Sequence, residues 1–416
     1  MSFTRRGVGL LVSAALSALI LPGGAAIGLF LLAFVVVATD AWQVRNPPQT
    51  RIEVAPTLSR GVPSSLRVVV EPAIRTRVKV AESPDLRIDP NEGSGGLDAT
   101  VTAIRRGTHV IPPIGTIRFG PLGLGSWYHR SGEAVTVVVY PDMPAARRIA
   151  TEVRLGRFGD AARRSRGPLG LGTELEAIRD YLPDDDIRQV NWRATARVGS
   201  PMSNTYRIEQ EREVVLLVDT GRLMASPVGD GTERTRLDVA IDAAAAVAAV
   251  ADVVGDRVGV IAFDAALRRR LTPRRDGGEA VVAAIHALEP APDESDFELA
   301  FRTVAHNKRA FVLLLTDLLD EAASRPLVRA MPILARHHAL AVAGVSDPAV
   351  TEAITTPAAD ATEAYRTAIA IDIEASRRRV ASVLGGYGAV IIDVPAASLP
   401  RACVAAYLRA KDRARL

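Results

Sequence analysis

A long run without charge near the N-terminus is the feature that most constrains the fold of this chain. No charged residue occurs from Gly7 to Thr39, and the run is interrupted only by the turn signal Pro22-Gly23-Gly24. Each half offers about 15 residues, or roughly 22 Å of helix, which is slightly less than a hydrocarbon core of about 30 Å. Tilt, uncharged flanks and local thinning of the bilayer would complete the crossing. The sequence therefore predicts a two-helix membrane anchor over residues 1–45.

Arginines flank this apolar run on both sides. Arg5 and Arg6 precede it, Arg45 follows it, and Trp42 stands where an interfacial aromatic side chain is expected. The pattern predicts a multi-pass protein of the cell membrane, with both ends of the hairpin and the C-terminal domains in the cytoplasm. A cleaved signal peptide is the alternative, and it would send the rest of the chain outside the cell. The hairpin is favoured because the apolar run continues past any plausible cleavage point and the chain has a single cysteine.

The composition limits the classes of partner. The chain has 416 residues, of which 48% are hydrophobic, enough for two or three domains at the usual domain size. Its 51 basic residues are spread along the sequence and balanced by 47 acidic ones, so no nucleic-acid partner is expected. The single cysteine, Cys403, excludes an internal disulfide framework and a cysteine-based zinc site. The oligomeric state does not follow from the sequence.

Short alternating segments follow the Pro-rich junction at residues 45–49. The stretches SLRVVVEP and EAVTVVVYP alternate apolar and polar residues and are bounded by turn-forming residues. They predict an all-β, sandwich-like module over residues 46–142. This module has no cluster of His, Cys or carboxylate side chains, so we expect a spacer or an interaction domain. Residues 143–212 are predicted to form a linker and a signature helix.

Strands and helices alternate regularly over residues 213–416. Apolar strands end at Asp219, Asp264, Asp317 and Asp347, and helical segments separate them. This order predicts an α/β, doubly wound domain with a parallel sheet, in which ligands bind at the carboxyl ends of the strands. Asp219 and Asp317, with Ser295 and Asp296 from a loop, could converge there and offer the hard oxygen ligands that Mg²⁺ or Ca²⁺ prefers. The alternative, which spacing alone favours, is that each aspartate caps a helix or makes a turn.

The stretch YLPDDDIRQVNWRATAR at residues 181–197 concentrates charge and one tryptophan. Asp186 can cap a helix from Ile187 to Val198 whose buried face would hold Ile187, Val190, Ala194 and Val198. Neighbouring aspartates in a turn give no reason for perturbed pKa values, so we predict no catalytic residue here. We predict instead a structural clasp and docking surface formed by Tyr181, Pro183, Asp185, Asp186, Arg188, Asn191, Trp192, Arg193, Ala196 and Arg197.

The same stretch resembles the signature of the bacterial domain-of-unknown-function family 58. The segment GPLGLGSWYHRSGEAVTVVVYP at residues 120–141 is similar to the segment that precedes the signature in that family. The strands VVLLVDTGRLM and LLLTDLLD resemble the first and fourth strands of the von Willebrand factor A-like domain that follows it. The resemblance implies a membrane-anchored bacterial protein that acts through binding, often beside a MoxR-type AAA+ ATPase, with no enzymatic activity common to the family.

The resemblance also implies a metal site that this sequence alters. A-like domains commonly hold a metal through Asp-x-Ser-x-Ser, a threonine loop and a later aspartate. Here Gly221 and Leu223 replace both serines, and Arg222 brings a positive charge that opposes a cation. A weakened site, with Mg²⁺ as its possible cofactor, would consist of Asp219, Thr220, Ser295, Asp296 and Asp317.

Three functional classes follow from these features. The first, which we favour, is a membrane-tethered, non-enzymatic scaffold that serves as adaptor for a MoxR-type AAA+ ATPase in complex assembly or envelope processes. The second is a metal-dependent hydrolase that uses the aspartate edge and would lose activity on Asp317→Ala. The third is a binder of anionic surfaces through arginine-rich segments such as residues 163–166, with affinity that falls steeply with salt.

Overall fold

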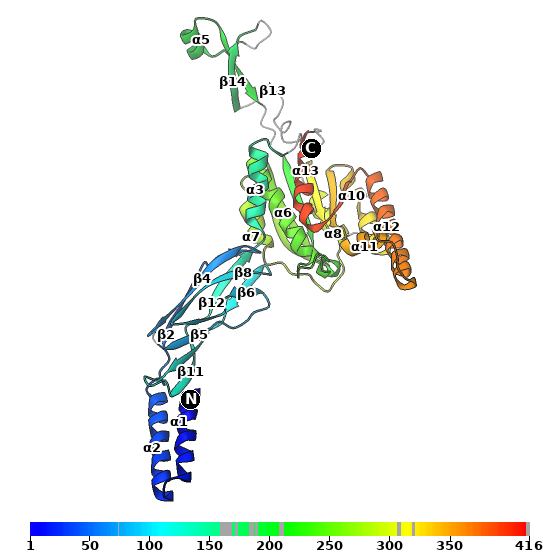
Figure 1. The fold of residues 1–416 in the computed structure, drawn as a ribbon. Helices are drawn as coiled ribbons and strands as arrows, with labels where there is room; N and C mark the ends of the chain where they lie inside the picture. The colour runs from blue at the N-terminus through cyan, green and yellow to red at the C-terminus, as the bar shows by residue number, and fades with distance from the viewer. Residues whose placement is uncertain are drawn as a thin grey trace. The chain divides into compact units, whose positions relative to one another are not determined.

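The chain folds into two compact units, Met1–Asp142 and Met143–Leu416 (Figure 1). The structure is a computed structural model that describes residues 1–73, 75–158, 169–170, 174–182, 187, 190–207, 212–305, 309–317 and 321–412. The protein is therefore multidomain and contains both helices and sheets, as the sequence predicts.

Two helices open the first unit. α1 (Arg5–Leu16) is capped by the Thr4 side chain and continues into a 3-10 turn at Ser17–Leu19. α2 (Gly23–Trp42) starts within the predicted turn, so that Pro22 is its N-cap and Gly23 and Gly24 are helical. Among the described residues, α2 is the one helix that is long and apolar enough to cross a membrane by length and composition. α1 has only 12 residues, so the two predicted spans are unequal in length.

The rest of the first unit is built from strands. A five-stranded sheet has the order β1-β11-β10-β5-β7, a three-stranded sheet has the order β3-β12-β9, and a four-stranded sheet has the order β2-β4-β8-β6. Alternate residues of these strands point into one apolar core around Leu66, Val101 and Val137. The strands are β1 (Ser2–Phe3), β2 (Gln49–Val54), β3 (Thr57–Ser59), β4 (Pro63–Glu71), β5 (Thr76–Lys79), β6 (Leu86–Asp89), β7 (Glu92–Ser94), β8 (Gly96–Ala103), β9 (Gly107–Ile111), β10 (Ile114–Phe119), β11 (Gly125–Ser131) and β12 (Val135–Tyr140).

A six-stranded sheet with the order β18-β17-β16-β19-β20-β21 forms the centre of the second unit. Five strands run parallel to one another. Among them, β16, β17, β19 and β20 are almost entirely buried and apolar, as parallel strands covered by helices on both faces are, whereas β21 is only partly buried. β18 is antiparallel to β17 at one edge and was not anticipated from the sequence, because its arginine-rich residues lack an apolar run. The strands are β16 (Glu213–Asp219), β17 (Arg257–Phe263), β18 (Leu267–Arg274), β19 (Ala310–Leu315), β20 (Ala339–Val345) and β21 (Val390–Val394).

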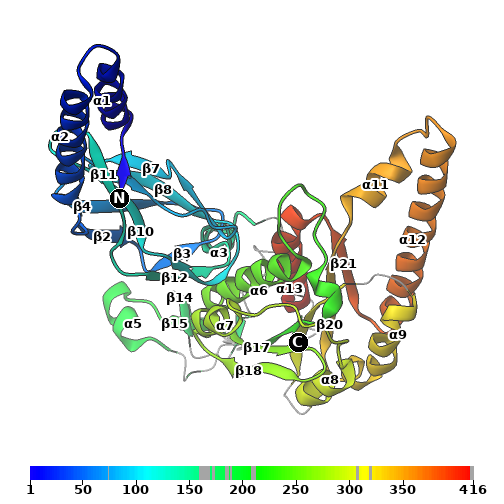
Figure 2. The ribbon, with the colours of Figure 1, turned by 90° about the horizontal axis from the view of Figure 1, so that it is seen from below.

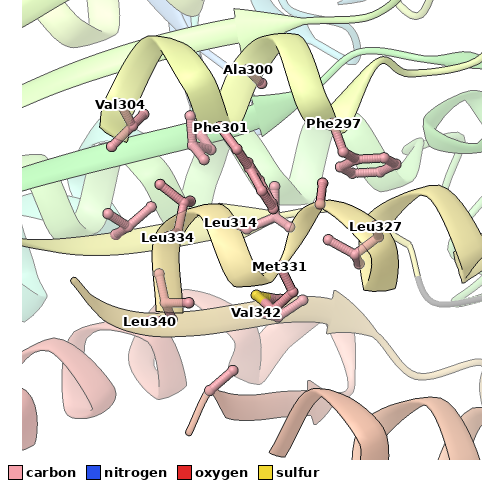
Figure 3. Close-up of a cluster of buried hydrophobic side chains, with 14 of the residues drawn as sticks. Phe297, Ala300, Phe301, Val304, Leu314, Leu327, Met331, Leu334, Leu340 and Val342 are labelled. Atoms are coloured by element: carbon pink, nitrogen blue, oxygen red, sulfur yellow. The ribbon is translucent and has the colours of Figure 1, made fainter. Parts of the chain in front are cut away.

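Helices cover both faces of this sheet. α6 packs with α7 and α13 on one face, and α8, α9, α10 and α12 pack on the other, where Phe297, Phe301 and Leu334 meet strand residues such as Leu314 (Figures 2 and 3). The helices are α6 (Arg236–Val253), α7 (Gly278–Ile285), α8 (Phe297–Ala305), α9 (Glu321–Ala330), α10 (Pro332–Ala335), α11 (Pro348–Thr355), α12 (Ala361–Gly386) and α13 (Leu399–Asp412).

Residues 143–212 contain more regular structure than the linker and signature helix that the sequence predicts. α3 (Met143–Arg154) buries Ala146, Ile149, Ala150 and Val153 and packs against α6. β13 (Leu169–Gly170), β14 (Glu174–Asp180) and β15 (Met202–Arg207) form a separate three-stranded sheet. α5 (Trp192–Val198) lies between β14 and β15 in the sequence, so the signature residues sit on the connection of a β-hairpin.

Candidate functional site

Asp219 lies at the centre of the carboxyl edge of the sheet, at the end of β16. Its side chain is buried and accepts hydrogen bonds from the Gly221 amide (2.8 Å), the Ser295 hydroxyl (2.5 Å) and the Thr316 hydroxyl (2.6 Å). Burial raises the pKa of Asp219 even though these three donors act in the opposite direction. The carboxylate is thus held in place by donors from three separate loops. One of these donors, Thr316, was not predicted from the sequence to belong to the site.

Ser295 occupies the space that a side chain at position 221 would need. A Cβ atom built on Gly221 would lie 2.1 Å from the Ser295 Oγ. The resemblance implied that Gly221 removes a hydroxyl from this edge, and the structure places the Ser295 hydroxyl there instead. This hydroxyl donates its hydrogen to Asp219.

Two of the predicted metal ligands point elsewhere. The Thr220 hydroxyl donates to the Phe263 carbonyl (3.0 Å) and approaches Asp264 (3.3 Å), on the side toward β17. Asp296 accepts a hydrogen bond from the Leu299 amide in the first turn of α8 (2.9 Å). Asp296 is therefore a helix-capping residue, which was the alternative that its spacing favoured.

Asp317 pairs with two buried arginines that the sequence analysis did not single out. Arg236 donates from Nη1 to Asp317 Oδ1 (2.6 Å), and Arg377 donates from Nη2 to the same oxygen (3.4 Å). Both guanidinium groups also donate to the Val345 carbonyl, each at 3.0 Å. Asp347 and Asp393 lie 3.9 Å from Arg236 and 3.6 Å from Arg377, respectively, at the rim of the cluster.

The charges of this cluster nearly balance inside the protein. Burial raises the pKa of Asp317, and the positive charges of Arg236 and Arg377 offset part of this effect. Asp317 Oδ2 is buried and has no hydrogen-bond partner among the described residues. The guanidinium groups of Arg236 and Arg377 therefore neutralise Asp317 in the place where a bound metal ion would otherwise do so.

Neighbouring charges are paired as well. Arg268 donates to Asp264, and although burial acts to raise the pKa of Asp264, this bond and one from the Ala266 amide leave it lowered. Arg222 forms an exposed ion pair with Glu294 (3.2 Å), whereas the ion pairs of Asp317 are with Arg236 and Arg377. Asp264 and Asp317 are thus both paired with arginines of the same chain.

The donor set does not fit a divalent cation in this arrangement. Gly221 and Leu223 offer no side-chain oxygen, Ser295 and Thr316 direct their hydrogens to Asp219, and Asp317 faces guanidinium groups. Within the described ranges, no group of three or more His, Cys, Asp and Glu side chains is placed to hold a metal ion. The structure thus brings Asp219 and Ser295 together but directs Thr220, Asp296 and Asp317 to other partners.

The signature helix is shorter than predicted. α5 begins at Trp192 rather than Ile187, and its N-cap is Asn191, whose side chain accepts a hydrogen bond from the Ala194 amide (2.9 Å). Asn191 also donates to Asn204 (2.8 Å), which ties the start of α5 to β15. The predicted positions Pro183, Asp185, Asp186 and Arg188 lie outside the described residues.

The predicted buried face of this helix is not buried: Ile187 and Val198 are exposed, and Val190 and Ala194 are half-buried. No residue of α5 is buried; Val198 is 63% exposed, Trp192 is 71% exposed, and the preceding Ile187 is 70% exposed. Arg193, Ala196 and Arg197 are exposed too, while Tyr181 is half-buried and its amide donates to the Pro201 carbonyl (2.9 Å). Periodicity alone does not show whether another element covers the apolar side chains of a helix.

Residues that sequence reasoning missed had weak signals. Arg236 is the first residue of α6, where Thr235 and Asp238 form a capping box, and a cation at a helix N-terminus is disfavoured by the helix dipole. Arg377 is one of three consecutive arginines on α12. The unfavourable position of Arg236 at a helix N-terminus was the one feature of the sequence that pointed to a carboxylate partner, which the structure shows to be Asp317.

Comparisons with known proteins agree with the signature. The family described as "Protein of unknown function DUF58" matches residues 177–383. Uncharacterized proteins of Mycobacterium tuberculosis (strain ATCC 25618 / H37Rv) and Mycobacterium bovis (strain ATCC BAA-935 / AF2122/97) are 30% identical over 186 residues, which cover 43% of this chain and 56% of each relative. The chain thus spans about half the length of the curated relatives it matches. Residues 177–383, which include α5, the sheet edge at Asp219 and most of α12, are therefore similar to the DUF58 family.

Proposed function

We propose that this protein is a membrane-anchored, non-enzymatic scaffold that acts as adaptor for a MoxR-type AAA+ ATPase. The observation that carries the proposal is the pairing of Asp317 with Arg236 and Arg377 at the carboxyl edge of the sheet. A hydrolase that used this edge would need carboxylates free to hold a metal or a proton at the substrate. Asp219, Asp264 and Asp317 are instead occupied by donors from the same chain.

The sheet order supports an A-like fold for the second unit. The first strand, β16, lies in the middle, β17 and the antiparallel β18 lie on one side, and β19, β20 and β21 follow on the other. In such a doubly wound sheet, the order reverses at β16, where ligands are expected to bind. We propose that this fold presents its carboxyl edge as a metal-independent protein-binding surface.

The signature hairpin is the proposed docking surface for the ATPase. It offers a large exposed aromatic residue, Trp192, between exposed Ile187 and Val198, and it presents Arg193 and Arg197 on the same short helix. Aromatic residues and arginines are enriched where protein interfaces gain most of their binding energy. The two arginines favour an acidic patch on the partner.

The N-terminal helices are the proposed anchor. α2 is long and apolar enough to cross a bilayer. In the sequence, Arg5 and Arg6 stand at the start of the helix pair and Arg45 follows it. We propose that α1 and α2 form a retained hairpin and that the second unit lies in the cytoplasm, as the positive-inside rule favours.

Affinity capture tests the scaffold. The full-length protein would be captured from detergent-solubilised membranes in Mg²⁺ or in EDTA, and the retained proteins identified. Recovery of an AAA+ ATPase in both conditions supports a metal-independent adaptor, and loss of the ATPase in EDTA would show that the sheet edge uses a cation. If no ATPase is retained in either condition, the adaptor proposal fails, and hydrolase activity or salt-sensitive anion binding becomes the better account.

A further inference from the structure

The turn at residues 120–125, which we call the anchor turn, is bonded to the end of α2. The Asp40 side chain, in the last turn of α2, accepts hydrogen bonds from the amides of Leu122 (2.7 Å), Leu124 (2.8 Å) and Gly125 (2.9 Å). Asp40 is buried, and a Cβ atom on Gly120 would lie 2.3 Å from its carboxylate. The Gly-rich turn at residues 120–125 therefore wraps a carboxylate from the apolar helix.

The start of the helix pair is fastened to the same turn. The Thr4 hydroxyl donates to the Gly123 carbonyl (2.7 Å), and the Thr4 amide donates to the Leu124 carbonyl (3.0 Å). β1 pairs with β11, with Phe3 opposite Gly125. The start of α1 and the end of α2 are thus both fastened to the anchor turn.

Five arginines, which we call the collar, lie near the anchor turn, the start of α1 or the end of α2: Arg5, Arg6, Arg45, Arg75 and Arg118. Three of them contact the anchor turn, α2 or the segment that follows α2. Arg75 donates to the Gly120 carbonyl (3.0 Å), Arg118 donates to the Asn46 carbonyl (2.9 Å), and Arg45 stacks on Trp42 at 4.4 Å from the ring centroid. Arg5 and Arg6 occupy the first turn of α1.

The positive charge of the collar arginines is not neutralised by the described part of the fold. Cations in the first turn of a helix are opposed by the helix dipole, so Arg5 and Arg6 cost α1 some stability. None of the five forms an ion pair with a carboxylate of the described residues, and the only acidic residue from Met1 to Asn46 is Asp40, which is buried and already bonded. Trp42, Leu122 and Phe3, at the end of α2, in the anchor turn and before α1, are exposed, as apolar and aromatic side chains are at a membrane interface.

We propose that the collar binds the headgroups of anionic phospholipids and seats the β-module directly on the membrane surface. The inference rests on the proposed membrane anchor and adds the lipid class that the anchor selects. Guanidinium groups without a carboxylate partner can form bidentate hydrogen bonds with phosphate, and arginines near an anionic bilayer each strengthen association by about fivefold.

Native mass spectrometry of the full-length protein tests this binding. The protein would be purified in detergent, equilibrated with an equal mixture of phosphatidylglycerol and phosphatidylcholine, and examined for retained lipid. We expect preferential retention of phosphatidylglycerol, reduced by about fivefold for each arginine removed in Arg45→Ser/Arg118→Ser. The matched variant Arg67→Ser/Arg87→Ser removes the same charge from the exposed face of the four-stranded sheet and should keep the wild-type preference.

Equal retention of the two lipids by the wild-type protein would overturn the collar, and so would equal losses in both double variants. Alkaline carbonate extraction of cell membranes separates this failure from failure of the anchor. A protein that stays in the membrane pellet but lacks lipid preference has an anchor without a collar. A protein that is released by carbonate has no spanning anchor, and both proposals then fail.

Discussion

The Ser295 hydroxyl lies where a side chain at Gly221 would stand, 2.1 Å from the position of its Cβ atom, and it donates a hydrogen bond to Asp219. The two positions are therefore coupled, because only one of them can carry a hydroxyl at this point. The coupling explains how the carboxyl edge keeps Asp219 bonded without the serine that the A-like pattern has at position 221.

Gly221→Ser should destabilise the protein through this clash. We expect a loss of about 1–3 kcal/mol in the free energy of unfolding, as for other overpacked sites. Urea denaturation of the full-length protein in detergent measures the change. In Gly221→Ser/Ser295→Ala the new hydroxyl can replace the lost one, so most of the stability should return. A double variant no more stable than Gly221→Ser alone would contradict the coupling.

Arg236→Met should destabilise the protein strongly. It leaves Asp317 buried with only the longer contact to Arg377, and breaking a buried ion pair at one partner costs about 3–5 kcal/mol. The same denaturation experiment checks the loss. Arg222→Met serves for comparison because its pair with Glu294 is exposed, and such pairs contribute at most about 1 kcal/mol. Similar losses in both variants would show that the buried pair has no special role.

The raised pKa of buried Asp219 predicts a specific pH dependence. Between the pKa of the unfolded chain, about 3.9, and the raised pKa of the folded protein, only the folded state holds the proton. The contribution of Asp219 to the free energy of unfolding therefore falls as pH rises through this interval and is constant above it. The stability of the wild type relative to Asp219→Asn should follow this course in urea titrations from pH 4 to pH 8. A relative stability that rises with pH would mean that the hydrogen bonds outweigh burial.

Trp192→Ala should weaken capture of the proposed ATPase partner. A large aromatic residue at the centre of an interface commonly contributes more than 2 kcal/mol, which corresponds to roughly a thirtyfold loss of affinity. Quantitative affinity capture from solubilised membranes gives the ratio. Tyr365→Ala serves as the control, because it removes an exposed aromatic side chain on a different helix, α12, and should leave capture unchanged. If both variants capture equally well, the signature hairpin is not the docking surface.

Asp40→Ala should loosen the turn at residues 120–125. It removes the acceptor of three amide hydrogens at Leu122, Leu124 and Gly125. Hydrogen exchange at these amides should then accelerate at least tenfold, because each lost hydrogen bond to a charged group is worth about 1.5–3 kcal/mol. Asp98→Ala, on the exposed face of β8, provides the comparison. Unchanged exchange in Asp40→Ala would show that the turn is held by its own backbone.

The sequence by itself determined the elements whose signal is local. The uncharged run predicted α2, the apolar segment before Asp219 predicted β16, and the alanine-rich segment after Thr235 predicted α6, because hydrophobic length and periodicity act over a few neighbouring residues. The family similarity of the signature was also readable from its residues and agrees with the match over residues 177–383.

Only the tertiary structure decided the partners of these elements. Arg236 and Asp317 are 81 positions apart, and no pattern in either segment indicates that a guanidinium group stands at the predicted metal edge. Ser295 reaches Asp219 across 76 positions, and Asp40 reaches Leu124 across 84. Burial was likewise undecided, since the apolar spacing of Ile187 and Val198 shows a face but not whether another element covers it. Long-range contacts depend on how strands and loops meet in space, and a single sequence does not encode that proximity locally.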